Sequence, residues 1–404
     1  MSNPTCPCCG HLASEPLYEV HNVPVHSVTV LRTPQDARAI TTGEIALSLC
    51  GHCGFVFNSA FDGAKQDYFH DYVSTQAMSP VFNSFHRRLA QDLIDRHDLH
   101  GRHVVEIGCG QGEFLELLCT LAGNNGTGFD PAYEPGRTLP EGVRIIKDVY
   151  SKRHAEAAGD FIACKMTLEH IGAVGDFVVG VREAAGDDAK RIVFFQVPDA
   201  GHVLAENGFW DVYYEHCSYF FASTLGTLFT RAGFTVTKLR SDYDGQYLMV
   251  EGHPAPNTQE AGAPPGDAAP PPADVARTIA EVRRFAREVP QILADWSHDL
   301  KRHKAEGKRT VLWGGGSKAV AFLTTLGVTD EIEAAVDINP EKHGSFLAVT
   351  AHPVIGPEQL RGQAIDRVIV MNPIYCDEIA AHLRTLGVSA ELVPVTAVLA
   401  RLAA

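Results

Sequence analysis

Long hydrophobic runs are missing from this sequence. No stretch approaches the roughly 18 consecutive apolar residues that a membrane-spanning helix requires. The first residues, MSNPTCPCCG, also lack the charged start and apolar core of a secretory signal peptide. We therefore expect a cytoplasmic protein with no membrane partner. Because thiols stay reduced in the cytoplasm, the ten cysteines are expected to be metal ligands or buried core residues, not disulfides.

Positive charge is also scarce. The chain has 34 lysine and arginine residues against 49 aspartate and glutamate residues, which gives a net charge of -15 at pH 7. This balance excludes a protein whose main task is to bind nucleic acid or an anionic membrane, but it leaves room for a local pocket that binds one anionic small molecule. At roughly 100–200 residues per domain, 404 residues predict two or three domains.

Five cysteines occur near the N-terminus, four of them in two C-x-x-C-G units. Cys6 and Cys9 form the first unit, and Cys50 and Cys53 form the second. The glycine after each unit permits the positive φ of a tight turn, so that both thiolates can point inward. Together they predict a tetrahedral zinc site with no position open for substrate, and hence a structural zinc. A redox pair or reduced core cysteines are the alternative, and Cys8 is a competing ligand in the first unit.

After this module, predicted strands and helices alternate. Residues 80–98 have the apolar spacing of a helix, and HVVEIG, GTGFD, DFIACKM and RIVFFQVP read as strands. This alternation predicts a parallel, doubly wound α/β sheet. Residues 253–273 are rich in proline, alanine and glycine, which indicates a linker. A long polar helix over about 274–305 and a second α/β unit from Arg309 follow.

A glycine-rich loop, VVEIGCGQGEFL, joins the first of these strands to a helix. Gly108 and Gly110 follow Glu106, whose carboxylate would repel the pyrophosphate of a dinucleotide but attract a cationic ligand. The loop resembles motif I of class I methyltransferases, which bind the sulfonium cofactor S-adenosylmethionine.

That resemblance implies further cofactor contacts at the ends of the next strands. Asp130 would accept hydrogen bonds from the ribose hydroxyls, and Asp148 would accept one from the adenine amino group. Lys165, at the end of the fourth strand, would lie near the methionine part. For either aspartate taken alone, a solvated turn residue is the alternative.

The segment FWDVYYEHCSYFF, residues 209–221, places Glu215 next to His216 among aromatic residues. A histidine whose pKa is about 6.5 can act as a general base at neutral pH, and a neighbouring carboxylate can hold its tautomer and raise its basicity. The segment therefore predicts a catalytic base at His216 assisted by Glu215. A histidine buried in the core is the alternative.

Nearly the whole chain resembles the three-module sugar C-methyltransferases, which methylate nucleotide-linked 4-keto-6-deoxysugars at C3. The resemblance lies in both C-x-x-C-G units, EIGCGQG, YYEHCSYF, GGGSKAV and VDINPEKHG. It implies a class I methyltransferase doubly wound sheet with an N-terminal zinc-binding module and a C-terminal Rossmann-like α/β domain. The expected boundaries are 1–68 for the zinc module, 69–252 for the S-adenosylmethionine-binding domain, 253–273 for the linker and 274–404 for the helix and C-terminal domain.

The same resemblance implies roles for single residues. His216, with Glu215 beside it, would remove the proton next to the ketone, and the enolate would take the methyl group. Tyr213 and Tyr72 map onto tyrosines that line the sugar, and His170 maps onto a second active-site histidine that can stabilise the enolate. Core packing, a surface position and a structural cap are the respective alternatives. The segments CKMTLEHI and DGQYLMVEG depart from the family pattern, which leaves the acceptor open.

The C-terminal unit begins with TVLWGGGSKAV, a strand, glycine turn and helix. Ser317 and Lys318 stand at the helix N-terminus, where backbone N–H groups favour an anion. The family resemblance implies a degenerate nucleotide fold here, in which they would help to hold the diphosphate of the substrate or cover the site. Asp337 stands where a dinucleotide-binding fold has its ribose-binding acid, so an NAD site is one alternative and a purely structural lid is another.

Three functions are compatible with these patterns. The favoured one is an S-adenosylmethionine-dependent C-methyltransferase of a nucleotide-linked deoxysugar. The second is an O- or N-methyltransferase of another natural-product small molecule on the same scaffold. The third is a zinc-dependent binding protein whose cofactor fold has lost its activity.

Overall fold

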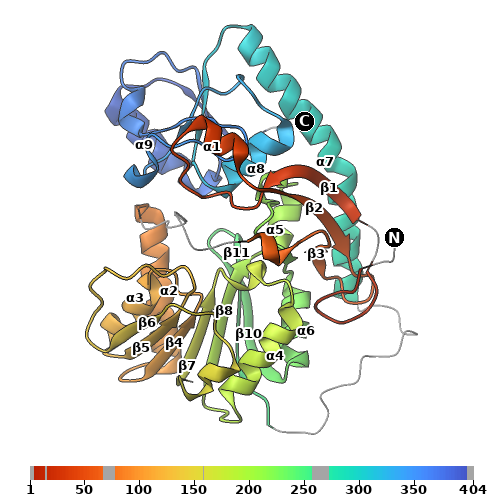
Figure 1. Cartoon of the computed structure of the whole chain (residues 1–404), viewed down its shortest axis with the longest axis vertical. Helices are drawn as coiled ribbons and strands as arrows, with labels where there is room; N and C mark the ends of the chain where they lie inside the picture. Colours follow the sequence, from red (N-terminus) through yellow and green to blue (C-terminus); the bar gives the residue numbers. More distant parts are fainter. Residues whose placement is uncertain (1–3, 14–15, 67–77, 158, 257–272, 398–404) are drawn as a thin grey trace.

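The computed structural model describes residues 4–13, 16–66, 78–157, 159–256 and 273–397 (Figure 1). Its strands form three sheets, of four, seven and five strands. No helix in these ranges is both long enough and apolar enough to cross a membrane. Short 3-10 helices punctuate the connections: η1 (Gly63–Lys65), η2 (Lys152–Ala157), η3 (Leu168–His170), η4 (Phe209–Asp211), η5 (Pro340–Lys342), η6 (Pro357–Leu360) and η7 (Pro373–Tyr375).

The N-terminal sheet is antiparallel, with the order β1-β2-β3-β9. Its strands are β1 (Pro16–Pro24), β2 (Thr42–Leu49), β3 (Val56–Asn58) and β9 (Ser218–Tyr219), and helix α1 (Pro34–Ala39) follows β1. The fourth strand comes from the segment that carries Glu215 and His216, because Val56 pairs with Tyr219. The N-terminal sheet therefore holds this segment by backbone hydrogen bonds.

The central sheet has the order β10-β11-β8-β7-β4-β5-β6. Its strands are β4 (His103–Ile107), β5 (Asn125–Phe129), β6 (Val143–Ile146), β7 (Phe161–Lys165), β8 (Ile192–Pro198), β10 (Phe234–Asp242) and β11 (Tyr247–Pro254). The sheet is not wholly parallel as predicted, since β11 runs antiparallel to β8 and β10. The reason is the short turn after β10, where Tyr243, Asp244 and Gly245 all have positive φ; so short a connection can join only antiparallel strands.

Helices cover both faces of the central sheet. They are α2 (Pro80–His97), α3 (Glu113–Ala122), α4 (Val174–Ala185), α5 (Ala200–Ala205) and α6 (Ala222–Arg231). Side chains alternate along each strand: Val104 packs in the core beneath α2 and α3, and Val105 packs in the core with α4 and α6. This two-faced coverage confirms the predicted doubly wound α/β fold.

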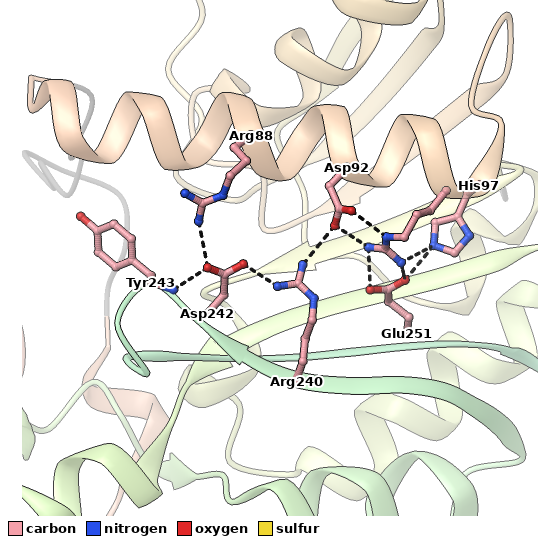
Figure 2. Close-up of polar contacts among 8 residues, drawn as sticks. Arg88, Asp92, His97, Arg240, Asp242, Tyr243 and Glu251 are labelled. Carbon is pink, nitrogen blue, oxygen red and sulfur yellow. Dashed lines mark hydrogen bonds and ion pairs between the residues drawn. The ribbon is translucent and has the colours of Figure 1, made fainter.

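Helix α2 confirms the helix predicted for residues 80–98. Ser79 caps it through a hydrogen bond from the backbone N–H of Phe82, and its buried residues include the apolar ones that predicted it. On its polar side, charged residues of α2 and of strands β10 and β11 form a continuous chain of ion pairs (Figure 2). In this chain the Glu251 carboxylate, almost fully buried, accepts hydrogen bonds from Arg96 and His97. The ion pairs fasten α2 to the edge of the sheet.

The C-terminal sheet is parallel, with the order β14-β13-β12-β15-β16. Its strands are β12 (Thr310–Trp313), β13 (Ala335–Val336), β14 (Val354–Ile355), β15 (Arg367–Val370) and β16 (Glu391–Pro394), with helices α8 (Ser317–Leu326) and α9 (Cys376–Leu386). Strand β12 is central and the chain winds outward on both sides, as in a Rossmann-like domain.

Helix α7 (Ala273–Ala305) connects the parts of the molecule. It runs along one side, past β1 and β2 toward the C-terminal domain (Figure 1). Its apolar stripe, which includes Phe285, Val289 and Trp296, lies in one core together with β1, the segment around Trp210, and α8. Segments that lie far apart in the sequence therefore share one hydrophobic core.

Candidate active site

The segment predicted to be catalytic is buried where the three sheets approach one another. Trp210 is fully buried, and the ring of Phe209 stacks on that of Phe322 in α8. The hydroxyl of Tyr214 accepts a hydrogen bond from the backbone N–H of Asp62 in the N-terminal module. A Cβ atom at Gly43 would lie 2.3 Å from the Tyr214 ring, so only glycine fits there. Tyr214 is thus a core aromatic that fixes the segment.

His216 lies at the centre of this junction. The Tyr213 hydroxyl is 3.0 Å from its Nε2 atom, and the ring of His170 stands edge-on to it at 5.0 Å between centroids. Burial, together with the nearby His170 and Lys318, holds the pKa of His216 well below its ordinary value. The imidazole is therefore neutral at physiological pH and has a lone pair with which to accept a proton.

Glu215 does not lie beside the His216 ring as the sequence suggested. Its carboxylate accepts hydrogen bonds from the backbone N–H (3.1 Å) and the hydroxyl of Ser27 in the N-terminal module. The Ser27 hydroxyl is also 2.8 Å from that of Ser317 in the C-terminal domain. Burial raises the pKa of Glu215 to about 7, although the hydrogen bonds from Ser27 oppose this effect. Glu215 therefore joins the three parts of the chain.

The carboxyl group near His216 is that of Glu169. Its Oε1 atom lies 4.0 Å from Nε2 of His216. Sequence reasoning missed this residue, although it precedes His170 in the segment TLEHI. His170 itself is held by a hydrogen bond to the backbone of Glu215, and burial lowers its pKa to about 4. The ligand atoms of Glu169, His170 and His216 all lie within 4.8 Å of one another.

The glycine-rich loop adjoins this cluster. Gly108 has φ +68°, and a Cβ atom there would lie 2.0 Å from the Thr167 hydroxyl oxygen. That hydroxyl donates to the Gly108 carbonyl (3.4 Å) or to that of Lys165 (3.0 Å), which ties the loop to the end of β7. Gly110 has φ +55° and open space where a Cβ would stand. The loop therefore combines close packing at Gly108 with an open surface at Gly110.

Glu106 has the environment expected of a carboxylate that receives a cation. It is buried, and its Oε2 atom has no hydrogen-bond partner among the described residues. Burial raises its pKa to about 8, against the opposing effect of Lys165. A cationic ligand at this atom would relieve the desolvation, which fits S-adenosylmethionine.

The side chain of Lys165 contacts neighbours that the sequence did not predict. Its Nζ atom is 2.9 Å from Nε2 of His86 in α2 and lies over the Phe114 ring. Burial lowers the pKa of Lys165 to about 8 and that of His86 to about 3, so His86 can accept the hydrogen bond as a neutral ring.

The two aspartates expected near the cofactor have partners within the chain. Asp130 accepts hydrogen bonds from the backbone N–H groups of Gly110 (2.8 Å) and Ala132 (2.7 Å), and so shapes the glycine loop. Asp148 is paired with Arg153 at 2.5 Å. A carboxylate has about four lone-pair sites, so each aspartate keeps acceptor capacity beyond these contacts.

The residues proposed to bind diphosphate face the catalytic segment. The Lys318 ammonium is 2.6 Å from the Asp211 carboxylate in η4, and Ser317 contacts Ser27. Asp337 accepts a hydrogen bond from the backbone N–H of Gly315 at 3.0 Å and also contacts Lys342. The glycine turn therefore uses Asp337 as an internal hydrogen-bond acceptor.

The structure gathers Cys6, Cys9, Cys50 and Cys53, all buried, with their sulfur atoms within 4.8 Å of one another. The Cys6–Cys53 and Cys9–Cys50 sulfur distances are 3.8 and 3.5 Å. Zinc–sulfur bonds of about 2.3 Å in a tetrahedron give sulfur separations of about 3.8 Å, so the cluster fits that ion. Gly10 (φ +80°) and Gly54 (φ +76°) have the positive φ that the sequence predicted.

Tyr72, the remaining predicted catalytic residue, lies outside the described residues. Apart from the four cysteines, the other predicted residues fall into two groups. One group surrounds His216, and the other surrounds the glycine loop; they meet at the end of β7 through Thr167.

Two family models match the chain. A model described as a methyltransferase domain matches residues 82–239, which include the glycine loop and the His216 cluster. The protein is an S-adenosylmethionine-dependent methyltransferase. A second model, described as a C-methyltransferase C-terminal domain, matches residues 273–392 of this methyltransferase.

Individual proteins add to this comparison. The methyltransferase is 26% identical to the C-methyltransferase NovU of Streptomyces niveus over 388 residues. The matched region covers 93% of this chain and 90% of that protein. A solved structure of 1,6-didemethyltoxoflavin-N1-methyltransferase from Burkholderia thailandensis, with bound S-adenosylhomocysteine, is 16% identical and matches 50% of this chain and 96% of its own, with a TM-score of 0.34. An N,N-8-amino-8-demethyl-D-riboflavin dimethyltransferase from Streptomyces davawensis is 16% identical and matches 43% of this chain and 56% of its own, also with a TM-score of 0.34.

Proposed function

We propose that this enzyme methylates a carbon next to a ketone in a nucleotide-linked deoxysugar, through an enolate, with His216 as the base. The observation that carries the proposal is the neutral, buried His216 imidazole, with a tyrosine hydroxyl 3.0 Å from its Nε2 atom, beside the glycine loop. The match to a C-methyltransferase C-terminal domain and to the C-methyltransferase NovU supports transfer to carbon.

The glycine loop supplies the cofactor site in this proposal. Glu106 would face the cationic part of S-adenosylmethionine, Gly108 and Gly110 would line its path, and Asp130 would offer its free lone pairs to the ribose. When bound, S-adenosylmethionine supplies a methyl group on a positively charged sulfur. Asp148 and Lys165 complete the proposed set through the adenine and methionine ends.

The chain's own residues would carry out the proton chemistry. His216 accepts the proton from the carbon next to the ketone, since its lowered pKa keeps the ring neutral. Tyr213 can orient the ring through its hydroxyl and line the sugar together with Tyr72. A developing oxyanion needs a hydrogen-bond donor in a site shielded from water, and Tyr213 or His170 can fill this role. Ser317 and Lys318 remain the proposed contacts for the diphosphate.

The four-cysteine cluster would hold a structural zinc ion. No thiolate would remain for substrate in a closed four-sulfur site, so the metal would take no part in methyl transfer. Its role would be to fix two turns of the N-terminal module, which also supplies Ser27 to Glu215.

The test uses a nucleotide-linked 4-keto-6-deoxysugar in deuterated water. We expect the wild-type enzyme to exchange the hydrogen next to the ketone and, with cofactor present, to form a carbon–methyl bond. His216→Ala should lower the rates of hydrogen exchange and of methyl transfer by about 10²–10⁴-fold. Calorimetry should show nearly unchanged cofactor affinity in this variant. The exposed His100→Ala is the matched control. Retained turnover in His216→Ala would mean that another residue is the base. A methyl group found on oxygen or nitrogen of the product would favour the alternative, an O- or N-methyltransferase.

A further inference from the structure

Glu169 is a buried carboxyl group without a visible reason for its burial. It lies in η3, just after the central strand β7, and is 1% exposed. In the described part of the chain no other residue donates a hydrogen bond to either of its carboxyl oxygens. Buried polar groups are nearly always paired, because an unpaired one forfeits its hydration without compensation. The Nε2 atom of the His216 ring lies 4.0 Å from its Oε1 atom.

The backbone around Glu169 fixes its position. The backbone carbonyl of Glu169 accepts a hydrogen bond from the thiol of Cys217, the residue after His216. Thr167, two residues earlier, is tied to the glycine loop. The carboxyl group is therefore held between the cofactor loop and the proposed base by the same short segment.

We propose that Glu169 is the positioning carboxyl of His216: its negative charge stabilises the imidazolium that forms when His216 takes the substrate proton. The proposal rests on the proposed function and assigns to Glu169 the role that the sequence had suggested for Glu215. The Glu215 carboxylate is directed to Ser27 and cannot serve the ring in this arrangement.

In the resting site the carboxyl of Glu169 is largely protonated at neutral pH, since burial raises its pKa to about 8. Loss of this proton to solvent leaves a carboxylate beside a neutral imidazole. During turnover the carbon–hydrogen bond breaks, its electron pair stays on the substrate as the enolate, and the proton forms a new N–H bond on His216. After methyl transfer, His216 releases that proton to solvent, which restores the pair.

Other titratable groups face this pair, and their effects have known signs. Lys165 favours the ionised form of Glu169. Lys318 and His170 disfavour a protonated His216, which increases the need for a nearby carboxylate. The thiols of Cys164 and Cys217 have raised pKa values and stay neutral. The hydroxyl of Tyr213 contacts His216 Nε2 directly.

The test compares pH profiles of the full-length enzyme with the ketosugar. For the wild type we expect kcat to rise with pH through an apparent pKa near 8, as Glu169 ionises. Glu169→Gln should lower kcat at pH 8.5 by about 10²-fold, leave KM and cofactor affinity nearly unchanged, and abolish this rise. Glu169→Asp, which keeps the charge, should recover part of the lost kcat and part of the rise with pH. Glu215→Gln should keep the rise, and the exposed Glu141→Gln should match the wild type.

Three results would overturn the inference. The first is an unchanged alkaline rise in Glu169→Gln, and the second is loss of the rise only in Glu215→Gln. The third is a second bound metal equivalent that disappears in Glu169→Gln, since Glu169, His170 and His216 would then be metal ligands. Failure of the proposed function is distinguishable, because the wild type itself would then exchange no hydrogen next to the ketone.

Discussion

Three glycines with similar backbone angles allow the cofactor loop to be tested by one type of substitution. Gly108, Gly110 and Gly123 have φ of +68°, +55° and +63°. An alanine at any of them takes up a left-handed conformation that costs about 1–2 kcal/mol, partly offset by about 0.4–1 kcal/mol from the lower entropy of the unfolded chain. Each substitution should therefore destabilise the protein by about 1 kcal/mol from the backbone alone.

The surroundings of the three positions then separate their effects. At Gly108 the new Cβ would lie 2.0 Å from the Thr167 hydroxyl oxygen, so Thr167 must move away from its hydrogen bonds; overpacking of this kind costs a further 1–3 kcal/mol or so. At Gly110 and Gly123 nothing lies within 4 Å. Gly110 faces the proposed cofactor path, whereas Gly123 ends helix α3 away from the loop.

Urea unfolding and calorimetry with S-adenosylmethionine measure the two effects separately. Gly123→Ala should lose about 1 kcal/mol of stability and keep wild-type affinity. Gly110→Ala should lose a similar amount of stability but bind the cofactor at least about tenfold more weakly, which corresponds to about 1.4 kcal/mol. Gly108→Ala should show the largest loss of stability, about 2–4 kcal/mol, and Thr167→Ala in the same chain should restore part of it. If Gly110→Ala binds as tightly as Gly123→Ala, the cofactor does not lie over this loop.

Two further predictions concern stability. Elemental analysis should find about one zinc ion per chain, and Cys50→Ser should lose it together with the folding of the N-terminal module; a metal-free wild type would exclude the zinc site. Glu251→Gln should destabilise the protein at pH 7 by at most about 3.5 kcal/mol, because His97 and Arg96 lower the pKa of Glu251 from 4.5 to about 2 and each unit is worth about 1.4 kcal/mol. This stabilisation is complete above pH 4.5 and is lost as the pH falls toward 2. In urea unfolding, the difference in free energy of unfolding between wild type and Glu251→Gln should therefore shrink by more than half at pH 3. An unchanged difference would contradict this prediction.

Local patterns predicted the elements of the fold well. The spacing of apolar residues predicted α2, because a helix buries every third or fourth residue whatever lies beneath it. The glycines after both cysteine pairs predicted the positive φ of Gly10 and Gly54, because glycine has no Cβ atom and adopts that conformation without steric cost. The antiparallel β11 was missed, since alternation of strands and helices does not report how the last two strands are joined.

Side-chain partners were the part that the sequence could not predict. Ser27 and Glu215 are 188 positions apart. Nothing in the sequence around Ser27 indicates that it would donate hydrogen bonds to Glu215. Glu215 and His216 are adjacent, yet neighbouring side chains outside a helix point in different directions, so adjacency was a poor guide to contact. Glu169 was identifiable in principle, because it precedes a residue already chosen as a candidate. Its proximity to His216 depends on how η3 and the catalytic segment pack.

The contacts of the catalytic segment explain why the methyltransferase domain is not expected to work alone. Strand β3 of the N-terminal module pairs with β9, which begins two residues after His216. Ser27 from the same module donates hydrogen bonds to the Glu215 carboxylate. From the other side, Lys318 pairs with Asp211 at the start of the segment. Without either partner, a buried charge would lose its compensation and apolar side chains such as Trp210 would face water. The flanking modules are therefore structural parts of the active site, whatever they contribute to recognition of the acceptor.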